Sequence, residues 1–190
     1  MNKGRIVIIS GPSGSGKTTL CMKVLDSPRF RGNLVKSISA TTRPKRSHEV
    51  NGRDYLFMGK EEFEAHIKAD GFLEYENVFG NYYGTPRRSV EDLLAKGRNV
   101  LLAIDVKGAK TVEKIYPDAL TIFINAPSME VLKGRLSERG SENTKDLAIR
   151  LKTAEEEMAQ AGRYRYAVVN DDLEKAYQRL EGILGRELGG

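Results

Sequence analysis

The chain has 190 residues, of which 39% are hydrophobic and 30% charged, as is typical of a soluble folded protein with a sizeable core. Lys and Arg outnumber Asp and Glu by 31 to 26, and this net charge of +5 is far below that of a histone-like protein. One cysteine, Cys21, excludes an internal disulfide. The first residues lack the apolar segment of a signal peptide, and no apolar run is long enough to span a bilayer, so we expect a cytoplasmic globular protein.

Apolar runs alternate with amphipathic segments along the chain. Buried parallel strands are predicted for RIVIIS, RNVLLAID, ALTIFINA and YRYAVVN, at 5–10, 98–105, 119–126 and 164–170. Apolar spacing predicts helices over 144–162 and 171–185, the second with Asp171 and Glu174 as a capping pair. Strands alternating with helices predict an α/β fold with a parallel sheet covered on both faces.

Residues 34–96 break this rhythm, because they are more polar, rich in Tyr and Arg, and contain short strands that resemble hairpins. We predict a core formed by residues 1–33 and 97–190, with 34–96 as an inserted subdomain. Within the insertion, TTRPKRSHEVNGRDY holds four cations in eleven positions. Such a cluster predicts an anionic partner: a nucleic acid, a membrane surface or a small phosphate.

The segment GPSGSGKTT, residues 11–19, matches G-x-x-x-x-G-K-[ST] between a predicted strand and a helix-competent segment. Its glycines allow backbone N–H groups to surround a phosphate, and Lys17 adds charge for the β- and γ-phosphates. The Thr18 hydroxyl can ligate Mg²⁺. An ordinary glycine-rich turn is the alternative, but the flanking elements favour binding of a nucleoside triphosphate with Mg²⁺ as cofactor.

Asp105 ends the apolar run NVLLAID, where a strand would meet the nucleotide. It is a candidate metal ligand acting through water. Alternatively, Asp105 caps the helix that starts near Gly108, and one side chain could serve both as metal ligand and as helix cap.

The group that would receive a phosphoryl group from the bound triphosphate is not specified by the P-loop. His48 and His66 have no evident pairing with a carboxylate and a nucleophile. A phosphate acceptor needs no general base, since its oxygen is already anionic, but it needs cations around both sets of phosphates. Arg43 and Arg46 are candidates for the acceptor phosphate. The candidates for the donor side are Arg135, Arg139 and Arg150.

Beyond the P-loop, a family resemblance rests on segments spread over most of the chain: SATTRPKRSHEVNGRDYLF, GFLEYENVFGNYYGTPRRSV, IDVKGA, LKGRLSERG and VVNDDLEKAY. The sequence resembles the guanylate kinases, which make GDP and ADP from GMP and ATP. The resemblance implies a three-layer P-loop core with a parallel sheet, a GMP-binding insertion at about 34–96 and a short mobile lid near 137–148. It also implies activity with dGMP.

The resemblance implies a role for each matching residue. The GMP phosphate would be bound by Arg43, Arg46, Tyr55 and Tyr83, and guanine by Ser39, Glu74 and Thr85, with Asp105 also on the GMP side. The ATP-binding residues would be Gly11, Pro12, Ser13, Gly14, Ser15, Gly16, Lys17, Thr18 and Asn170, of which Asn170 would approach adenine or else cap a helix. The catalytic residues would be Lys17, Arg43, Arg135, Arg139 and Arg150. A carboxylate such as Glu74 can accept from both N1–H and N2–H₂ of guanine.

Two positions depart from the family pattern: Ala103 stands where an acidic residue is common, and Lys107 where a glutamine is common. These departures concern the metal and water contacts rather than the reaction. A phosphopeptide-binding scaffold is an alternative, but scaffold domains typically lack a working P-loop. A kinase of another phosphorylated small molecule is a second alternative. We expect ATP and GMP as partners, with no nucleic acid or membrane, and leave the oligomeric state open.

Overall fold

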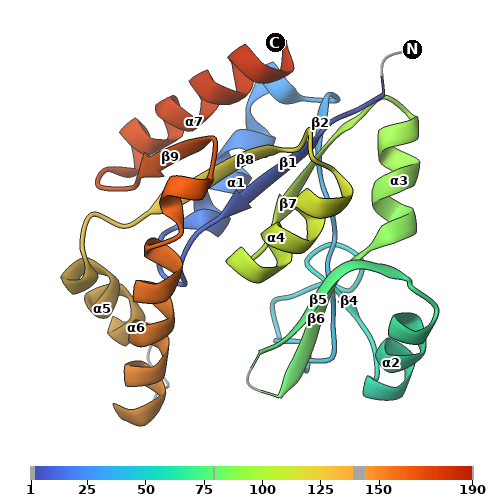
Figure 1. The fold of residues 1–190 in the computed structure, drawn as a ribbon, viewed down its shortest axis with the longest axis horizontal. Coiled ribbons are helices and arrows are strands. Elements are labelled where there is room, and N and C mark those ends of the chain that lie inside the picture. Colours follow the sequence, from blue (N-terminus) through green and yellow to red (C-terminus); the bar gives the residue numbers. More distant parts are fainter. Residues whose placement is uncertain (1–2, 79, 139–143, 190) are drawn as a thin grey trace.

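The structure, a computed structural model, describes residues 3–78, 80–138 and 144–189. Its core is a five-stranded parallel sheet in the order β2-β7-β1-β8-β9 (Figure 1). The strands are β1 (Ile6–Ser10), β2 (Leu34–Lys36), β7 (Asn99–Ala103), β8 (Leu120–Asn125) and β9 (Tyr166–Val169). The helices that cover the sheet are α1 (Lys17–Asp26), α3 (Arg87–Ala95), α4 (Val106–Ile115) and α7 (Leu173–Leu188).

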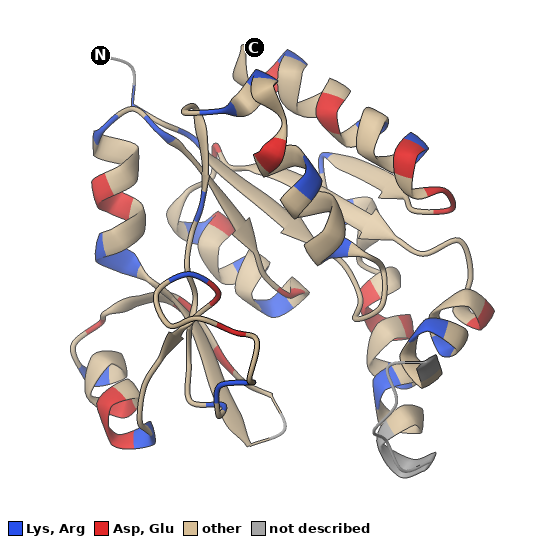
Figure 2. Ribbon diagram, turned by 180° about the vertical axis from the view of Figure 1, so that it is seen from behind, with Lys and Arg blue, Asp and Glu red and all other residues tan. Residues whose placement is uncertain are grey.

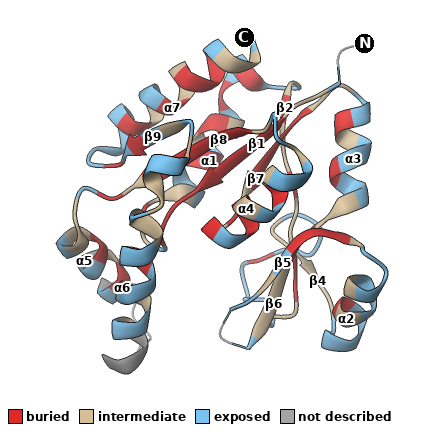
Figure 3. Cartoon of the chain, in the orientation of Figure 1, coloured by how far each residue is buried: buried red, intermediate tan, exposed pale blue. Residues whose placement is uncertain are grey.

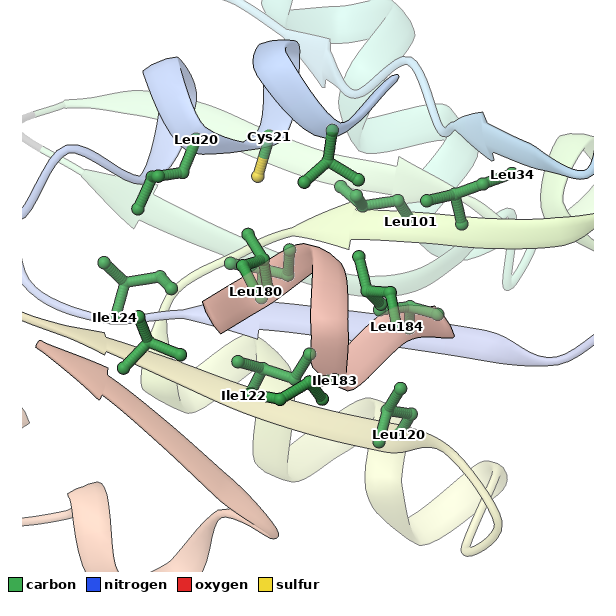
Figure 4. Packing of buried hydrophobic residues seen from close by; sticks show 14 of the residues in the cluster. Leu20, Cys21, Leu34, Leu101, Leu120, Ile122, Ile124, Leu180, Ile183 and Leu184 are labelled. Atoms are coloured by element: carbon green, nitrogen blue, oxygen red, sulfur yellow. The ribbon is translucent and has the colours of Figure 1, made fainter. Parts of the chain in front are cut away.

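Both faces of the core sheet are buried, as an all-apolar central strand requires (Figure 3). In β1, Val7 and Ile9 face α1 and α7, whereas Ile6 and Ile8 face α3 and α4. On the first face, side chains of the core strands pack against those of the two helices (Figure 4). Members of this cluster include Leu20, Cys21, Leu34, Leu101, Leu120, Ile122, Ile124, Leu180, Ile183 and Leu184. This cluster joins the sheet to α1 and α7, and a second cluster joins its other face to α3 and α4, which together give the expected three-layer core.

A second sheet lies beside the core, with strand order β4-β3-β6-β5. Its strands are β3 (Ala40–Thr41), β4 (Leu56–Phe57), β5 (Phe72–Val78) and β6 (Asn81–Pro86), and its helix is α2 (Lys60–Lys68). Phe63 of α2 is fully buried and stacks on Phe72 and Tyr82, with ring centroids 4.3 and 5.2 Å away. Aromatic packing therefore closes one face of this sheet.

Two further helices, α5 (Met129–Glu138) and α6 (Thr144–Met158), pack together through Leu132 and Ala154. This helix pair and the second sheet both project from the side of the core toward which β1 and β7 run (Figure 1). Two short 3₁₀ helices, Pro28–Phe30 and Ala161–Arg163, complete the described elements. In the described part of the chain, no helix is long and apolar enough to cross a membrane.

The four strands expected from apolar runs are confirmed, as are helices over most of 144–162 and 171–185. Two details were wrong. Leu34–Lys36 was expected in the insertion, but it pairs with β7 and so extends the core sheet, because the register joins Leu34 to Asn99. Asp171 was expected as the cap of the last helix, but Asp172 is the N-cap, and its side chain accepts from the Lys175 N–H at 2.9 Å.

Leu180→Ala is expected to lower the free energy of unfolding by about 2–5 kcal/mol, because the side chain is fully buried and its loss leaves a cavity. Leu173→Ala, on the same helix but 40% exposed, is the matched control and should cost less than about 1 kcal/mol. Urea denaturation followed by circular dichroism measures both. Equal losses would contradict the assignment of α7 as a core helix.

Candidate functional site

The site begins where two neighbouring parallel strands end. Ile9 of β1 lies opposite Ala103 of β7, and the Ile104 N–H donates to the Ile9 carbonyl at 3.3 Å. The residues that follow, Gly11 and Asp105, therefore leave the same edge of the sheet.

The loop between β1 and α1 has the conformation that its glycines were expected to permit. Gly11, Gly14 and Gly16 have φ values of 141°, 85° and 90°. A Cβ on Gly16 would also lie 2.2 Å from the Asn170 amide nitrogen, so the position excludes a side chain on two grounds. The Lys17 ammonium folds back to donate to the Gly11 carbonyl at 2.5 Å, and Thr18 is exposed in the first turn of α1.

Two of the expected ATP-side residues contact this loop. The Asn170 side chain, buried after β9, donates from Nδ2 to the Ser15 carbonyl at 2.8 Å. Arg135 of α5 donates to the Asn170 carbonyl at 3.2 Å and more weakly to the Gly14 carbonyl at 3.4 Å. The side chain of Asn170 thus supports the loop, and the helix cap once considered for it is supplied by Asp172.

Helix α6 carries Arg150, which is half-buried, while Arg139 lies outside the described residues, as do residues 140–143 of the expected lid. Glu157 lies seven residues after Arg150 and thus on the same face of α6. Burial raises the pKa of Glu157 to about 7, with Lys17 lowering it and Asp105 raising it. A carboxyl group of α6 therefore lies within electrostatic range of the P-loop. The sequence AEEEM gives no sign of which of its three glutamates has this position.

In the insertion, Arg43 is held by a residue that sequence reasoning missed. Its Nη2 and Nη1 donate to Glu49 Oε1 and Oε2 at 2.7 and 3.1 Å. The guanidinium carbon lies 5.5 Å from the centre of the Tyr55 ring, and Tyr55 and Tyr83 meet edge to face at 6.1 Å. The structure thus brings together three of the four expected phosphate ligands. Glu49 is one of two acidic residues in TTRPKRSHEVNGRDY, and the sequence does not distinguish it from Asp54.

Arg46 is placed differently, because its side chain is exposed and its backbone N–H donates to Glu49 Oε2 at 2.8 Å. The Arg43 pair, followed by this backbone bond, lowers the pKa of Glu49 to about 2. Glu49 is therefore ionised throughout the physiological pH range.

The expected guanine-reading residues lie on one face of the second sheet. Glu74 of β5 is opposite Thr85 of β6, and the Thr85 hydroxyl donates to Glu74 Oε1 at 2.5 Å. Ala40 pairs with Gly84, so the register brings Ser39, which precedes β3, next to Thr85. Ser39 and Thr85 alternate with Ala40 and Gly84, and a register shift between Phe72 and Glu74 aligns Glu74 with Thr85, so these three side chains lie opposite the face that packs on α2.

Glu74 is 8% exposed, and burial raises its pKa to about 7, opposed by the Thr85 hydrogen bond and reinforced by Asp105 and Glu76. Its carboxyl lies against α4, where a Cβ on Gly108 would be 2.7 Å from Oε2. Gly108 therefore leaves the space that this carboxyl fills. The side chain is about half protonated at neutral pH.

Asp105 is the N-cap of α4, and its Oδ1 accepts from the Gly108 N–H at 2.7 Å. The capping role is thereby confirmed, while the metal role stays a prediction. Among the described residues, no three His, Cys, Asp or Glu side chains gather as a metal site. One hydroxyl and one carboxylate nevertheless suit Mg²⁺, which is held by few protein oxygens together with phosphates and water.

The two departures from the family pattern also have a structural setting. Lys107, which is exposed, lies 3.9 Å from Glu76, which is half-buried, and this pair joins α4 to the second sheet. Burial raises the pKa of Glu76, and Asp105 raises it further. Ala103, half-buried at the end of β7, offers no carboxylate at this edge.

In Figure 2, the ribbon positions of Lys and Arg are interspersed with those of Asp and Glu along the described helices and loops.

Comparisons with known proteins agree with this arrangement. The model of the guanylate kinase family matches residues 3–187. Guanylate kinases of Clostridium tetani and Carboxydothermus hydrogenoformans are 46% and 45% identical over 187 residues, covering 98% of this chain and 88% and 90% of theirs. The solved guanylate kinase of Anaplasma phagocytophilum has a TM-score of 0.79 at 35% identity, with 100% of this chain and 89% of that chain covered. The chain belongs to the guanylate kinase family.

Proposed function

We propose that this protein transfers the γ-phosphoryl group of ATP to GMP, giving ADP and GDP. The observation that carries the proposal is the buried Glu74 carboxyl, hydrogen-bonded to Thr85 on the polar face of the second sheet. A P-loop alone would support many kinases. This carboxyl in the same molecule supports guanine as the acceptor base.

Guanine has two adjacent donors, N1–H and N2–H₂, and ionised Glu74 can accept both. Adenine has no donor at N1 and would leave a buried carboxylate unpaired, at a cost of about 1–3 kcal/mol or more. Ser39 is proposed to donate to O6 or N7, and Thr85 to do the same once its hydroxyl proton turns from Glu74 to the base. This difference supports selection of GMP over AMP.

On the donor side, the P-loop N–H groups and Lys17 are proposed to hold the ATP phosphates, with Arg135, Arg139 and Arg150 stabilising charge on the transferring group. Mg²⁺, held by Thr18 and through water by Asp105, would neutralise charge on the β- and γ-phosphate oxygens. Asn170 supports the ATP site by fixing the Ser15 carbonyl.

On the acceptor side, Arg43, Tyr55 and Tyr83 are proposed to bind the GMP phosphate, joined by Arg46 once its side chain turns inward. The attacking phosphate oxygen is anionic near neutral pH, so positioning and charge stabilisation suffice without a general base. We propose that the insertion (34–96) and the lid (137–148) close over both nucleotides and exclude water. The 2′-deoxy substrate dGMP is proposed as a second acceptor.

The direct test measures ADP formation from Mg·ATP with GMP, AMP, CMP or UMP as acceptor. We expect kcat/KM for GMP to exceed that for AMP by at least about 100-fold, as unpaired buried polar groups imply. Equal rates with GMP and AMP would refute guanine selection. Tight phosphopeptide binding without ADP formation would support the scaffold alternative instead.

Glu74→Gln should lower kcat/KM for GMP by about 100-fold while leaving KM for ATP unchanged, because the amide cannot accept from both guanine donors. Glu76→Gln is the matched control, since Glu76 lies on the same face of β5 two residues further on. We expect it to change kcat/KM for GMP by less than about threefold, because its ion pair with the exposed Lys107 is long, at 3.9 Å. A loss of ATP affinity in Glu74→Gln would contradict the division between the two sites.

The pH dependence of GMP use should report the raised pKa of Glu74. Guanine requires the ionised carboxylate, and this form is scarce below the folded-state pKa of about 7. KM for GMP is therefore expected to fall as the pH rises from 6 to 8. The phosphate of GMP itself ionises near pH 6, so the profile is compared with that of Glu74→Gln, which retains only the phosphate contribution. Identical profiles for the two proteins would show that Glu74 does not titrate in this range.

A further inference from the structure

The loop of residues 43–49 is organised around a single acidic side chain. Glu49 is 8% exposed, although its neighbours Lys45 and Arg46 are exposed cations. The Glu49 backbone N–H donates to the Arg46 carbonyl at 3.1 Å, and Lys45 Nζ donates to the Glu49 carbonyl at 3.0 Å. The side chain adds the pair with Arg43 and the bond from the Arg46 N–H. Glu49 therefore fixes both the path of the loop and the end of one guanidinium.

These bonds determine which part of Arg43 faces a ligand. Nη1 donates to both Glu49 Oε2 and the Pro44 carbonyl, the latter at 2.7 Å, while Nη2 donates to Glu49 Oε1. The guanidinium has two further N–H groups, on Nη2 and Nε, and Tyr83 interacts with the same group. A planar guanidinium held at one edge presents its other edge in a fixed direction.

The charges lead to the same conclusion. Ionised Glu49 cancels the charge of Arg43, so this pair offers a phosphate little net attraction. The pair instead presents N–H groups of Arg43 that are already oriented. The orientation of these donors, rather than net charge, then determines how much Arg43 contributes to phosphate affinity.

We propose that Glu49 is a positioning residue of the acceptor site, which orients Arg43 through a bidentate pair before the phosphate of a nucleoside monophosphate binds. The role rests on the proposed function, since GMP is the ligand that Arg43 would meet. Glu49 itself does not contact the reacting atoms.

The test compares Glu49→Gln with Glu64→Gln, a matched control. Glu64 is also a glutamate of this insertion that pairs with a cation, Lys60, at 3.8 Å, but the pair is exposed and lies on α2. Glu49→Gln should raise KM for GMP about tenfold or more, as expected for a misplaced binding group, with KM for ATP unchanged. Glu64→Gln should alter neither value more than about twofold.

A double-mutant cycle separates positioning from general stability. In an Arg43→Met background, adding Glu49→Gln should change KM for GMP by less than about twofold, because the residue through which Glu49 acts is gone. ATP binding by calorimetry reports whether each variant is folded. An unchanged or lower KM for GMP in Glu49→Gln, additive effects in the double mutant, or a parallel loss of ATP binding would each overturn the proposal. Wild-type protein that makes no ADP with GMP would instead refute the proposed function.

Discussion

The parallel pairing of β1 with β7 is the constraint on which the site depends. Because Ile9 lies opposite Ala103, the chain leaves both strands at one edge, and the P-loop and Asp105 emerge together. The pairing is enforced by burial of β1 on both faces, which leaves no side for a polar residue until Ser10. The fold thus places the glycine-rich loop, which is proposed to bind phosphate, beside an acidic helix cap.

The second sheet has one apolar face and one polar face, and packing on the first determines the position of the groups on the second. Its α2 face is closed by stacked aromatic rings, and its opposite face carries Ser39, Glu74 and Thr85. Packing on one face keeps the strands in register, and that register aligns the polar groups on the other. Gly108 of α4 then leaves room for the Glu74 carboxyl, so the proposed base-reading group lies on the second sheet while the space for it is provided by the core.

The sequence predicted what depends on local pattern and missed what depends on tertiary contact. The P-loop was evident because its strand, glycines and helix are contiguous. Strand β2 was assigned to the insertion because three residues carry too little periodicity to reveal a partner 65 positions away at Asn99. Glu49 and Glu157 were missed because a glutamate in a polar segment is usually solvated, and only the fold shows that one pairs with Arg43 and the other lies near Lys17. The role of Asn170 in supporting Ser15 likewise arises between segments 155 residues apart.

The burial of Glu74 has a thermodynamic consequence for the whole molecule. Without ligand, the carboxyl is a weak acid with two acidic neighbours, Asp105 and Glu76, and much of it carries a proton at neutral pH. The proposed contact with guanine requires the anion, so association with GMP releases that proton to the solvent. The enthalpy of association then includes the heat of protonating the buffer, and the acceptor site couples nucleotide capture to a small acidification of its surroundings.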